Sequence, residues 1–158
     1  ACIRYSRDNA RTPMQWSHEK EAGFTTGKPW LKVNPNYTEI NVEDQLKDED
    51  SVLHFYKKLI ALRKSEAYRE TLIFGRFVPA FDADEDVFAF YRESESGDRI
   101  FIAANFGKEE KMLTLPEKNY TVLLTNDDSA PEGTLSTLEN DGTLCLKSCG
   151  AIVLREEA

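Results

Sequence analysis

An acidic run at residues 82–86, DADED, is the group of side chains that most readily suggests a metal site. Counted from Asp82 as the first position of a calcium loop, Glu93 falls at position twelve, where an EF-hand carries its bidentate glutamate. Position six of that loop needs a glycine for its sharp turn, and here it is Val87, which opens the strand-like run VFAFY. The sequence therefore predicts a solvated hairpin turn, without metal ligands.

The three cysteines, Cys2, Cys145 and Cys149, are too few for a disulfide framework. Cys145 and Cys149 are four positions apart in a strand-like run, so both could face one side of a sheet. Zinc sites use the tighter Cys-x-x-Cys spacing, and neither His18 nor His54 is near in the sequence. We expect free thiols in a reducing, cytoplasmic setting. Both histidines lack triad partners, which favours surface or helix-face positions.

Residues 1–47 must position their side chains without regular structure, because Pro, Gly and Asn interrupt the segment throughout. Both tryptophans, Trp16 and Trp30, nevertheless lie in it. A loop this long and aromatic is uncommon unless it serves a site or packs on a larger body.

Two helices are predicted next. Asn41 is a favourable N-cap residue, with Asp44 three positions on, and predicts a short helix. Apolar side chains recur at helical spacing over 50–65, with basic residues late in the segment, where they suit the helix dipole. The apolar stripe of this second helix must be buried against another element.

From residue 72 onward the hydrophobic period is two, with turn residues between the runs, which is typical of short antiparallel strands. Asp141 and Gly142 form a hairpin signal. The predicted strands are 72–77, 87–92, 100–105, 111–115, 120–125, 133–138, 143–146 and 151–155.

The 158 residues include 20 basic and 28 acidic side chains, a net charge of −8 that argues against nucleic acid as a partner. Apolar stretches are too short to span a bilayer, so we expect no membrane association. No signal peptide opens the chain and its first residue is not Met, from which we expect an excised or processed piece.

Residues 6–16, SRDNARTPMQW, resemble the Arg-Thr-Pro-Met-Gln-Trp segment late in the catalytic barrel of α-amylase family glycoside hydrolases. The match continues through residues 22–30, 33–37, 39–42 and 62–64. Within that family the chain is similar to the branch of oligo-1,6-glucosidases, dextran glucosidases and sucrose isomerases.

The resemblance implies a (β/α)₈ barrel, an inserted subdomain and a C-terminal antiparallel β-domain. Residues 1–47 would be the loop after the eighth barrel strand, and 50–65 the last barrel helix. The predicted fold class is mainly β: an antiparallel β-sandwich of the Greek-key type, preceded by a long loop and the last helix of a truncated barrel. The predicted domains are 1–66, the barrel remnant, and 67–158, the β-domain.

By resemblance, Arg11 matches the arginine that reaches the glucose subsite and pairs with an acidic residue of an early barrel loop. A planar guanidinium suits this role because it can hold a carboxylate and donate to sugar hydroxyls together. The alternative is a loop arginine that bridges surface acids. Arg7 and Asp8 would line the aglycone side or serve the structure. Trp16 and Trp30 would stack on sugar rings or pack on the barrel.

Retaining glycoside hydrolysis needs a carboxylate nucleophile and a carboxylic acid about 5–5.5 Å apart. The family carries both, with a third acid, on earlier barrel strands, and no segment here resembles those motifs. A barrel also takes roughly 250 residues. The chain is therefore expected to be the C-terminal part of an α-glucosidase, itself inactive and without cofactor or metal. The parent would cleave α-1,6 bonds, with α-1,4 bonds as an option, in short oligosaccharides with retention.

The expected partners are the missing barrel and, in the parent, an α-glucosidic oligosaccharide, and the chain is expected to self-associate through exposed apolar surface. Two alternatives stay open. A parent that is a sucrose isomerase or transglucosidase would differ in loops of the missing barrel. A stand-alone carbohydrate-binding β-sandwich would expose clustered aromatics on one sheet face, whereas the apolar runs around Phe88, Phe90, Tyr91 and Phe101 suggest a core.

Overall fold

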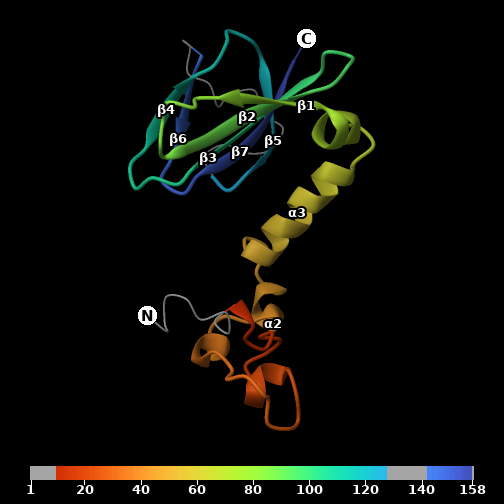
Figure 1. Cartoon of the computed structure of the whole chain (residues 1–158), viewed down its shortest axis with the longest axis vertical. Helices are drawn as coiled ribbons and strands as arrows, with labels where there is room; N and C mark the ends of the chain where they lie inside the picture. The colour runs from red at the N-terminus through yellow and green to blue at the C-terminus, as the bar shows by residue number, and fades with distance from the viewer. Residues whose placement is uncertain (1–9, 128–141, 158) are drawn as a thin grey trace. The chain divides into compact units, whose positions relative to one another are not determined.

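The computed structural model describes residues 10–127 and 142–157, which fall into two compact units divided between Lys57 and Lys58 (Figure 1). From Lys20 to its end, the first unit contains two 3₁₀ turns, one short helix and the start of another. These are η2 (Lys20–Gly23), η3 (Pro35–Thr38), α2 (Val42–Gln45) and the start of α3 (Val52–Lys64).

The predicted N-cap of α2 is confirmed. Asn41 is buried, and its Oδ1 accepts a hydrogen bond from the backbone N–H of Asp44 at 2.9 Å. Its Nδ2 donates to the Tyr37 carbonyl at 3.1 Å and to Asp44 Oδ2 at 2.7 Å. One amide thus fixes the start of the helix and the end of the preceding turn.

α3 confirms the helix predicted over 50–65. Ser51 Oγ accepts from the backbone N–H of His54 at 3.3 Å, and Arg63 and Lys64 lie in the last turn, where they favour the helix dipole. No residue of α3 is fully buried, so the burial predicted for the apolar stripe is incomplete. Its exposed members are Val52, Tyr56, Leu59 and Ile60, while Phe55 and Leu62 are half-buried. Within the described part of the chain, no helix combines the length and hydropathy needed to span a membrane.

A π-helical turn, η4 (Glu70–Phe74), replaces the first half of the strand predicted at 72–77. The Gly75 N–H donates to the Glu70 carbonyl at 2.9 Å, and a Cβ at Gly75 would lie 2.3 Å from the Thr71 carbonyl oxygen. The strand prediction was wrong here because a short apolar run is compatible with both the strand period and the helix period. The close approach of Gly75 to the Thr71 carbonyl, which needs a residue without Cβ, favours the helical turn.

The described residues of the β domain, 76–127 and 142–156, form seven strands. They are β1 (Arg76–Ala80), β2 (Val87–Glu93), β3 (Arg99–Asn105), β4 (Lys111–Thr114), β5 (Tyr120–Thr125), β6 (Thr143–Leu146) and β7 (Ala151–Glu156). The strand predicted at 133–138 lies outside the described residues, as does Asp141 of the predicted hairpin signal. The mainly β, antiparallel fold class is confirmed.

Five strands form one antiparallel sheet in the order β1-β2-β3-β7-β5, and β4 pairs with β6 in a second (Figure 1). β7, the last strand, therefore pairs with β3 and β5, although neither of them precedes it directly in the sequence. A bulge between Val122 and Leu124 shifts the register of β5 against β7.

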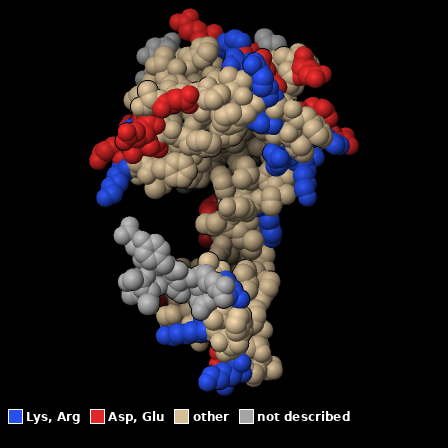
Figure 2. Space-filling view, in the orientation of Figure 1, with Lys and Arg blue, Asp and Glu red and all other residues tan. Residues whose placement is uncertain are grey.

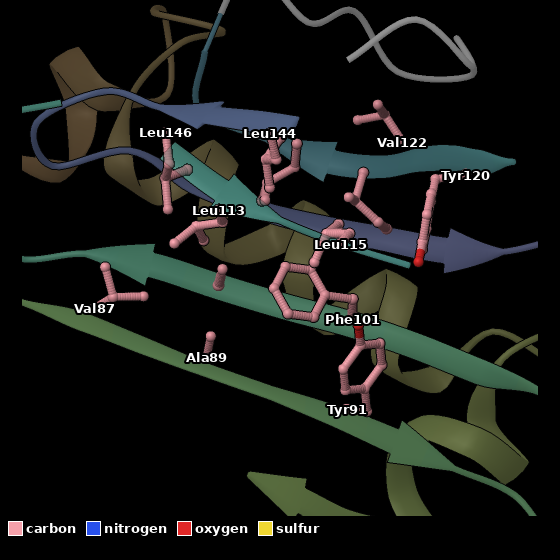
Figure 3. Close-up of a cluster of buried hydrophobic side chains, with 13 residues drawn as sticks. Val87, Ala89, Tyr91, Phe101, Leu113, Leu115, Tyr120, Val122, Leu144 and Leu146 are labelled. Carbon is pink, nitrogen blue, oxygen red and sulfur yellow. The ribbon is translucent and has the colours of Figure 1, made fainter. Parts of the chain in front are cut away.

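The hydrophobic core lies between the two sheets (Figure 3). Its members are Val87, Ala89, Tyr91, Phe101, Ala103, Leu113, Leu115, Tyr120, Val122, Leu144, Leu146, Ile152 and Leu154. Of the four aromatic residues expected in a core, Tyr91 and Phe101 belong to it. Phe88 and Phe90 do not, because alternate residues of a strand point to opposite faces of the sheet.

The cysteines also depart from the prediction. Cys145 is half-buried on β6, but Cys149 is exposed in the turn before β7 with a backbone φ of 57°. The two therefore do not share a strand face, since the strand ends at Leu146.

Candidate functional site

The candidate site is the loop that carries Arg11. The guanidinium carbon of Arg11 lies 5.1 Å from the centroid of the Trp30 ring, within cation–π range. Trp30 is 78 % exposed, and Arg11 is exposed as well. The pair therefore presents a cation held against an aromatic face. Arg7 and Asp8, the other predicted site residues, lie outside the described residues.

Backbone hydrogen bonds hold the segment that follows Arg11. The N–H groups of Trp16 and Ser17 both donate to the Ala22 carbonyl, at 2.9 and 3.1 Å. The Val42 N–H donates to the Gln15 carbonyl at 2.9 Å. The loop is thus tied to η2 on one side and to the start of α2 on the other, so a segment without regular period is still positioned.

The turn η2 depends on a left-handed backbone. Glu21, Ala22 and Gly23 have φ values of 54°, 57° and 65°. A Cβ at Gly23 would lie 2.6 Å from Ser17 Oγ, so glycine suits both this close approach and the left-handed backbone. This turn directs the Ala22 carbonyl toward the two amides that it binds.

The remaining aromatic surface of the loop is partly exposed. Trp16 and Phe24 are each about half-exposed, and so is Met14. Stacking on a sugar and packing on another part of a protein both remain predictions for Trp16. For Trp30 the structure adds a third role, contact with Arg11, which the residue order alone could not reveal.

Among the described residues, neither histidine belongs to a Ser-His-acid triad. His54 Nδ1 does lie 3.2 Å from Ser51 Oγ, but that hydroxyl also accepts from the His54 backbone N–H at the start of α3. His18 Nδ1 lies 3.9 Å from Glu43 Oε2 on the surface. His54 Nδ1 lies 2.7 Å from the Asp48 carbonyl oxygen, at the start of α3. Both positions agree with the surface and helix-face prediction.

The acidic run at 82–86 forms the predicted turn between β1 and β2. Lys111 Nζ, from β4, lies 2.8 Å from Asp84 Oδ1 and 2.9 Å from Asp86 Oδ2. The hydrogen bond from Lys111 lowers the pKa of Asp84, and the two carboxylates raise the pKa of Lys111. The run therefore serves as an ion-pair link between the turn and β4.

A buried ionisable cluster lies at the edge of the core. Arg99 Nη1 lies 3.2 Å from Glu156 Oε2, and its guanidinium carbon lies 4.1 Å from the centroid of the Tyr91 ring. Burial raises the pKa values of Tyr91 and Tyr120. Each charge has a nearby opposite charge or aromatic ring, which is the arrangement expected of a structural network.

The opposite, outer face of the five-stranded sheet carries an aromatic cluster of Phe77, Phe88 and Phe90, of which Phe88 and Phe90 were expected in the core. The ring centroids of Phe77 and Phe90 are 4.8 Å apart, and those of Phe88 and Phe90 are 5.3 Å apart. Phe77 is 47 % and Phe88 55 % exposed. The continuous apolar run of β2 could have indicated this cluster, because a strand that is apolar at every position has apolar side chains on both faces of its sheet.

Beside this cluster lies a cavity of about 420 Å³, here called the outer groove. Leu59, Leu62, Phe77, Phe90, Ile102 and Val153 provide apolar walls. Arg63 and Arg92 are its only charged lining residues among those described, and both guanidinium groups donate to backbone carbonyls, of Leu72 and Ile73, at 3.0 Å.

Comparison with known families assigns the chain in two parts. The model of the alpha amylase catalytic domain matches residues 1–71. The model of the alpha amylase C-terminal all-beta domain matches residues 78–157. The two matches are separated by residues 72–77, which run from within η4 into the start of β1.

Individual relatives agree. An alpha-glucosidase of Candida albicans is 42 % identical over 137 residues, which cover 86 % of this chain and 24 % of that protein. An oligo-1,6-glucosidase of Bacillus cereus is 45 % identical over 111 residues, 70 % of this chain and 19 % of that protein. The crystal structure of an isomaltulose synthase from Klebsiella sp. LX3 superposes with a TM-score of 0.81 at 36 % identity, over 96 % of this chain and 26 % of that one. The chain spans about a quarter, or less, of these proteins.

Proposed function

Because the chain belongs to the α-amylase family of glycoside hydrolases, we propose that it forms the C-terminal part of an α-glucosidase specific for short oligosaccharides. The bonds cleaved are α-1,6 glucosidic bonds, with α-1,4 bonds as an option, and the anomeric configuration is retained. The observation that carries the proposal is the 45 % identity to an oligo-1,6-glucosidase across the catalytic and all-beta matches.

In this proposal the chain contributes binding, and the carboxylates that break the bond come from other parts of the catalytic domain. Retaining hydrolysis requires a nucleophilic and an acidic carboxyl group on the two sides of the scissile bond. Arg11, with Arg7 and Asp8, belongs to the sugar-binding loop. Its guanidinium donates to sugar hydroxyls, and the Trp30 ring limits the directions in which it can point.

The β domain has a structural role. Its core is closed between two sheets (Figure 3), and the described polar clusters on it are ion pairs within the domain. The chain by itself is therefore expected not to hydrolyse oligosaccharides, and its partner is the rest of the catalytic barrel.

A hybrid enzyme tests the proposal. The Bacillus cereus oligo-1,6-glucosidase sequence that precedes its matched segment is joined to this chain at the first residue of the match. The hybrid is assayed with isomaltose and maltose, beside the chain alone. We expect isomaltose hydrolysis by the hybrid and none by the chain. A folded hybrid without hydrolysis would overturn the proposal, and so would hydrolysis by the chain alone.

A second candidate is a sucrose isomerase, which the likeness to an isomaltulose synthase favours. The test is the product formed from sucrose by the whole protein expressed from its own gene. Accumulation of an isomeric disaccharide would support the isomerase, and release of glucose and fructose would support the hydrolase.

A further inference from the structure

We propose that the β domain binds a short oligosaccharide in a second cavity, here called the hairpin groove. The inference adds a binding role to the structural role proposed for this domain. The choice of a glucose-based oligosaccharide rests on the proposed function. The cavity has a volume of about 700 Å³, which lies within the range of small-molecule sites. Its lining includes Glu70, Phe74, Arg76, Glu93, Glu95 and Ser96.

Three segments of the chain build the hairpin groove. η4 supplies Glu70 and Phe74, the start of β1 supplies Arg76, and the end of β2 and the hairpin after it supply residues 93–96. These segments meet because Gly75 lets η4 end against β2, where a Cβ would lie 2.9 Å from the Glu93 carbonyl oxygen. π-helical turns such as η4 are rare and frequently occur at functional sites.

Phe74 provides an open aromatic face in this groove. It is 66 % exposed, and it makes no ring contact with another aromatic residue in the described part of the chain. The rings of Phe77 and Phe90, by contrast, pack on each other with centroids 4.8 Å apart. An aromatic face that is open and has polar groups beside it suits the C–H face of a sugar ring.

The polar groups around Phe74 include both donors and acceptors. Arg76 Nη2 lies 3.0 Å from Glu93 Oε2, and the Arg76 side chain is 72 % exposed. The carboxylates of Glu70 and Glu95 have no hydrogen-bond or ion-pair partner among the described residues. A guanidinium only donates and a carboxylate only accepts. Sugar hydroxyls do both, so one sugar ring can satisfy both kinds of group.

The hairpin between β2 and β3 is fixed before any ligand binds. Ser94 Oγ lies 2.8 Å from Ser96 Oγ, and Ser96 Oγ donates to Asp98 Oδ2 at 2.8 Å. The Ser94 N–H donates to the Asp98 carbonyl at 2.9 Å. A rim that is already ordered lowers the entropy cost of binding.

The mixed charge of the groove favours a neutral ligand. Its lining has the carboxylates of Glu70, Glu93 and Glu95 and the guanidinium of Arg76, so an ion of either sign meets a like charge. Acidic and basic side chains also lie near one another toward the edges of the β domain in Figure 2. Because the carboxylates outnumber the guanidinium, an organic cation is the main competitor of a sugar.

Titration of the full 158-residue chain with isomaltotriose tests the inference, followed by two-dimensional NMR of the isotope-labelled protein. We expect saturable shifts of the backbone amides of Gly75, Glu95 and Ser96. Phe74→Ala should raise the Kd measured at these amides by about two- to tenfold, the value of one aromatic contact. Phe74→Trp keeps an aromatic face and should leave the Kd within about twofold of the parent value.

Two controls accompany Phe74→Ala. Phe106 is another exposed aromatic residue of the β domain, 76 % exposed, and does not line the groove, so Phe106→Ala should leave the Kd unchanged. Arg11 lies in the other compact unit and does not line the groove either. Arg11→Ala should therefore leave the shifts at Gly75 and Glu95 unchanged, which separates the groove from sugar binding by the Arg11 loop.

Salt distinguishes a sugar from an organic cation. Binding of spermidine should weaken when sodium chloride is raised to about 0.5 M, because salt screens charge attraction, whereas the Kd of isomaltotriose should not change. If spermidine bound at these amides more tightly than isomaltotriose and salt removed it, the groove would be a cation site and the inference would fail.

Two further results would overturn the sugar site: no shifts at these amides, or the same Kd for the parent chain and Phe74→Ala. Neither result depends on hydrolysis, which is measured in the hybrid enzyme. A hybrid that hydrolyses isomaltose, beside a chain without these shifts, keeps the proposed function and loses the sugar site. An inactive, folded hybrid, beside a chain with these shifts, keeps the sugar site and loses the function.

Discussion

The side chain of Asn105 links separate segments of the β domain. It is 2 % exposed at the end of β3. Its Nδ2 lies 2.8 to 3.0 Å from the carbonyl oxygens of Glu109, Leu146 and Lys147, and its Oδ1 accepts from the Gly107 N–H at 2.8 Å. One amide thus joins the turn after β3 to the end of β6.

We expect Asn105→Ala to lower the free energy of unfolding by about 2 to 3 kcal/mol, because it leaves buried backbone groups without partners. Urea unfolding followed by circular dichroism measures the loss. Asn126→Ala is the control, since the exposed Asn126 also bonds two backbone groups, of Cys149 and Ala151, but water can replace it. Equal losses of unfolding free energy in the two variants would contradict the role of Asn105 as a buried link between segments.

At the same scale, Trp30 is expected to position Arg11. In the hybrid enzyme, Trp30→Ala should raise the KM for isomaltose by about two- to fivefold, the value of an exposed cation–π contact, with less effect on kcat. Trp30→Phe should restore part of the loss, because a phenyl ring still offers a π face. A double-mutant cycle with Arg11→Ala measures the coupling, and additive effects would rule out the positioning role.

At the scale of elements, Lys111 ties the β1–β2 turn to β4 through Asp84 and Asp86. The pKa of Asp84 lies below its ordinary value of 3.8, so its contribution is present above pH 3.8 and is lost as the pH falls through the lowered value. The pKa of Lys111 lies above 10.5, so its contribution is complete below pH 10.5 and is lost as the pH rises further.

Lys111→Met should therefore be less stable than the parent chain in the neutral range, and the difference should shrink at both pH extremes. Urea midpoints measured across the pH range test this. Lys147→Met provides a control at a more exposed lysine, whose Nζ lies 2.8 Å from Asp127 Oδ1. A difference that stayed constant with pH would show that Lys111 acts through packing of its methylenes instead.

At the scale of the whole molecule, the two units differ in how much apolar surface they bury. The core cluster lies entirely within residues 87–154. The first unit has few buried side chains among its described residues, among them Pro13, Ala22 and Asn41. We therefore expect residues 10–47 to exchange amide hydrogens faster than β2, β3 and β7. Protection across 10–47 equal to that of the strands, in a chain shown by sedimentation to be a monomer, would contradict this.

Several whole-molecule statements stay predictions. The predicted domain boundary between residues 66 and 67 lies between the compact-unit division after residue 57 and the gap at 72–77 that separates the two family matches. Self-association of the chain and its cytoplasmic location also stay predictions. Sedimentation of the chain at several concentrations tests whether it self-associates.

Much of this protein could be predicted from its sequence, because the signals are local. The segment RTPMQW lies in a family match, Asn41 caps the helix that follows it, and period-two alternation marks the strands from 87 onward. Each signal is carried by residues close together in the chain, so no long-range contact was needed to interpret it.

Only the tertiary structure decided what distant residues do together. Strand order and register place Phe90 beside Phe77 on the outer face, and they place Lys111 between two carboxylates of a distant turn. The chain path through the loop brings Trp30 to Arg11. A contact between residues far apart in sequence depends on the packing of every element between them, and hydrophobic patterning specifies the face of a strand but not its neighbour.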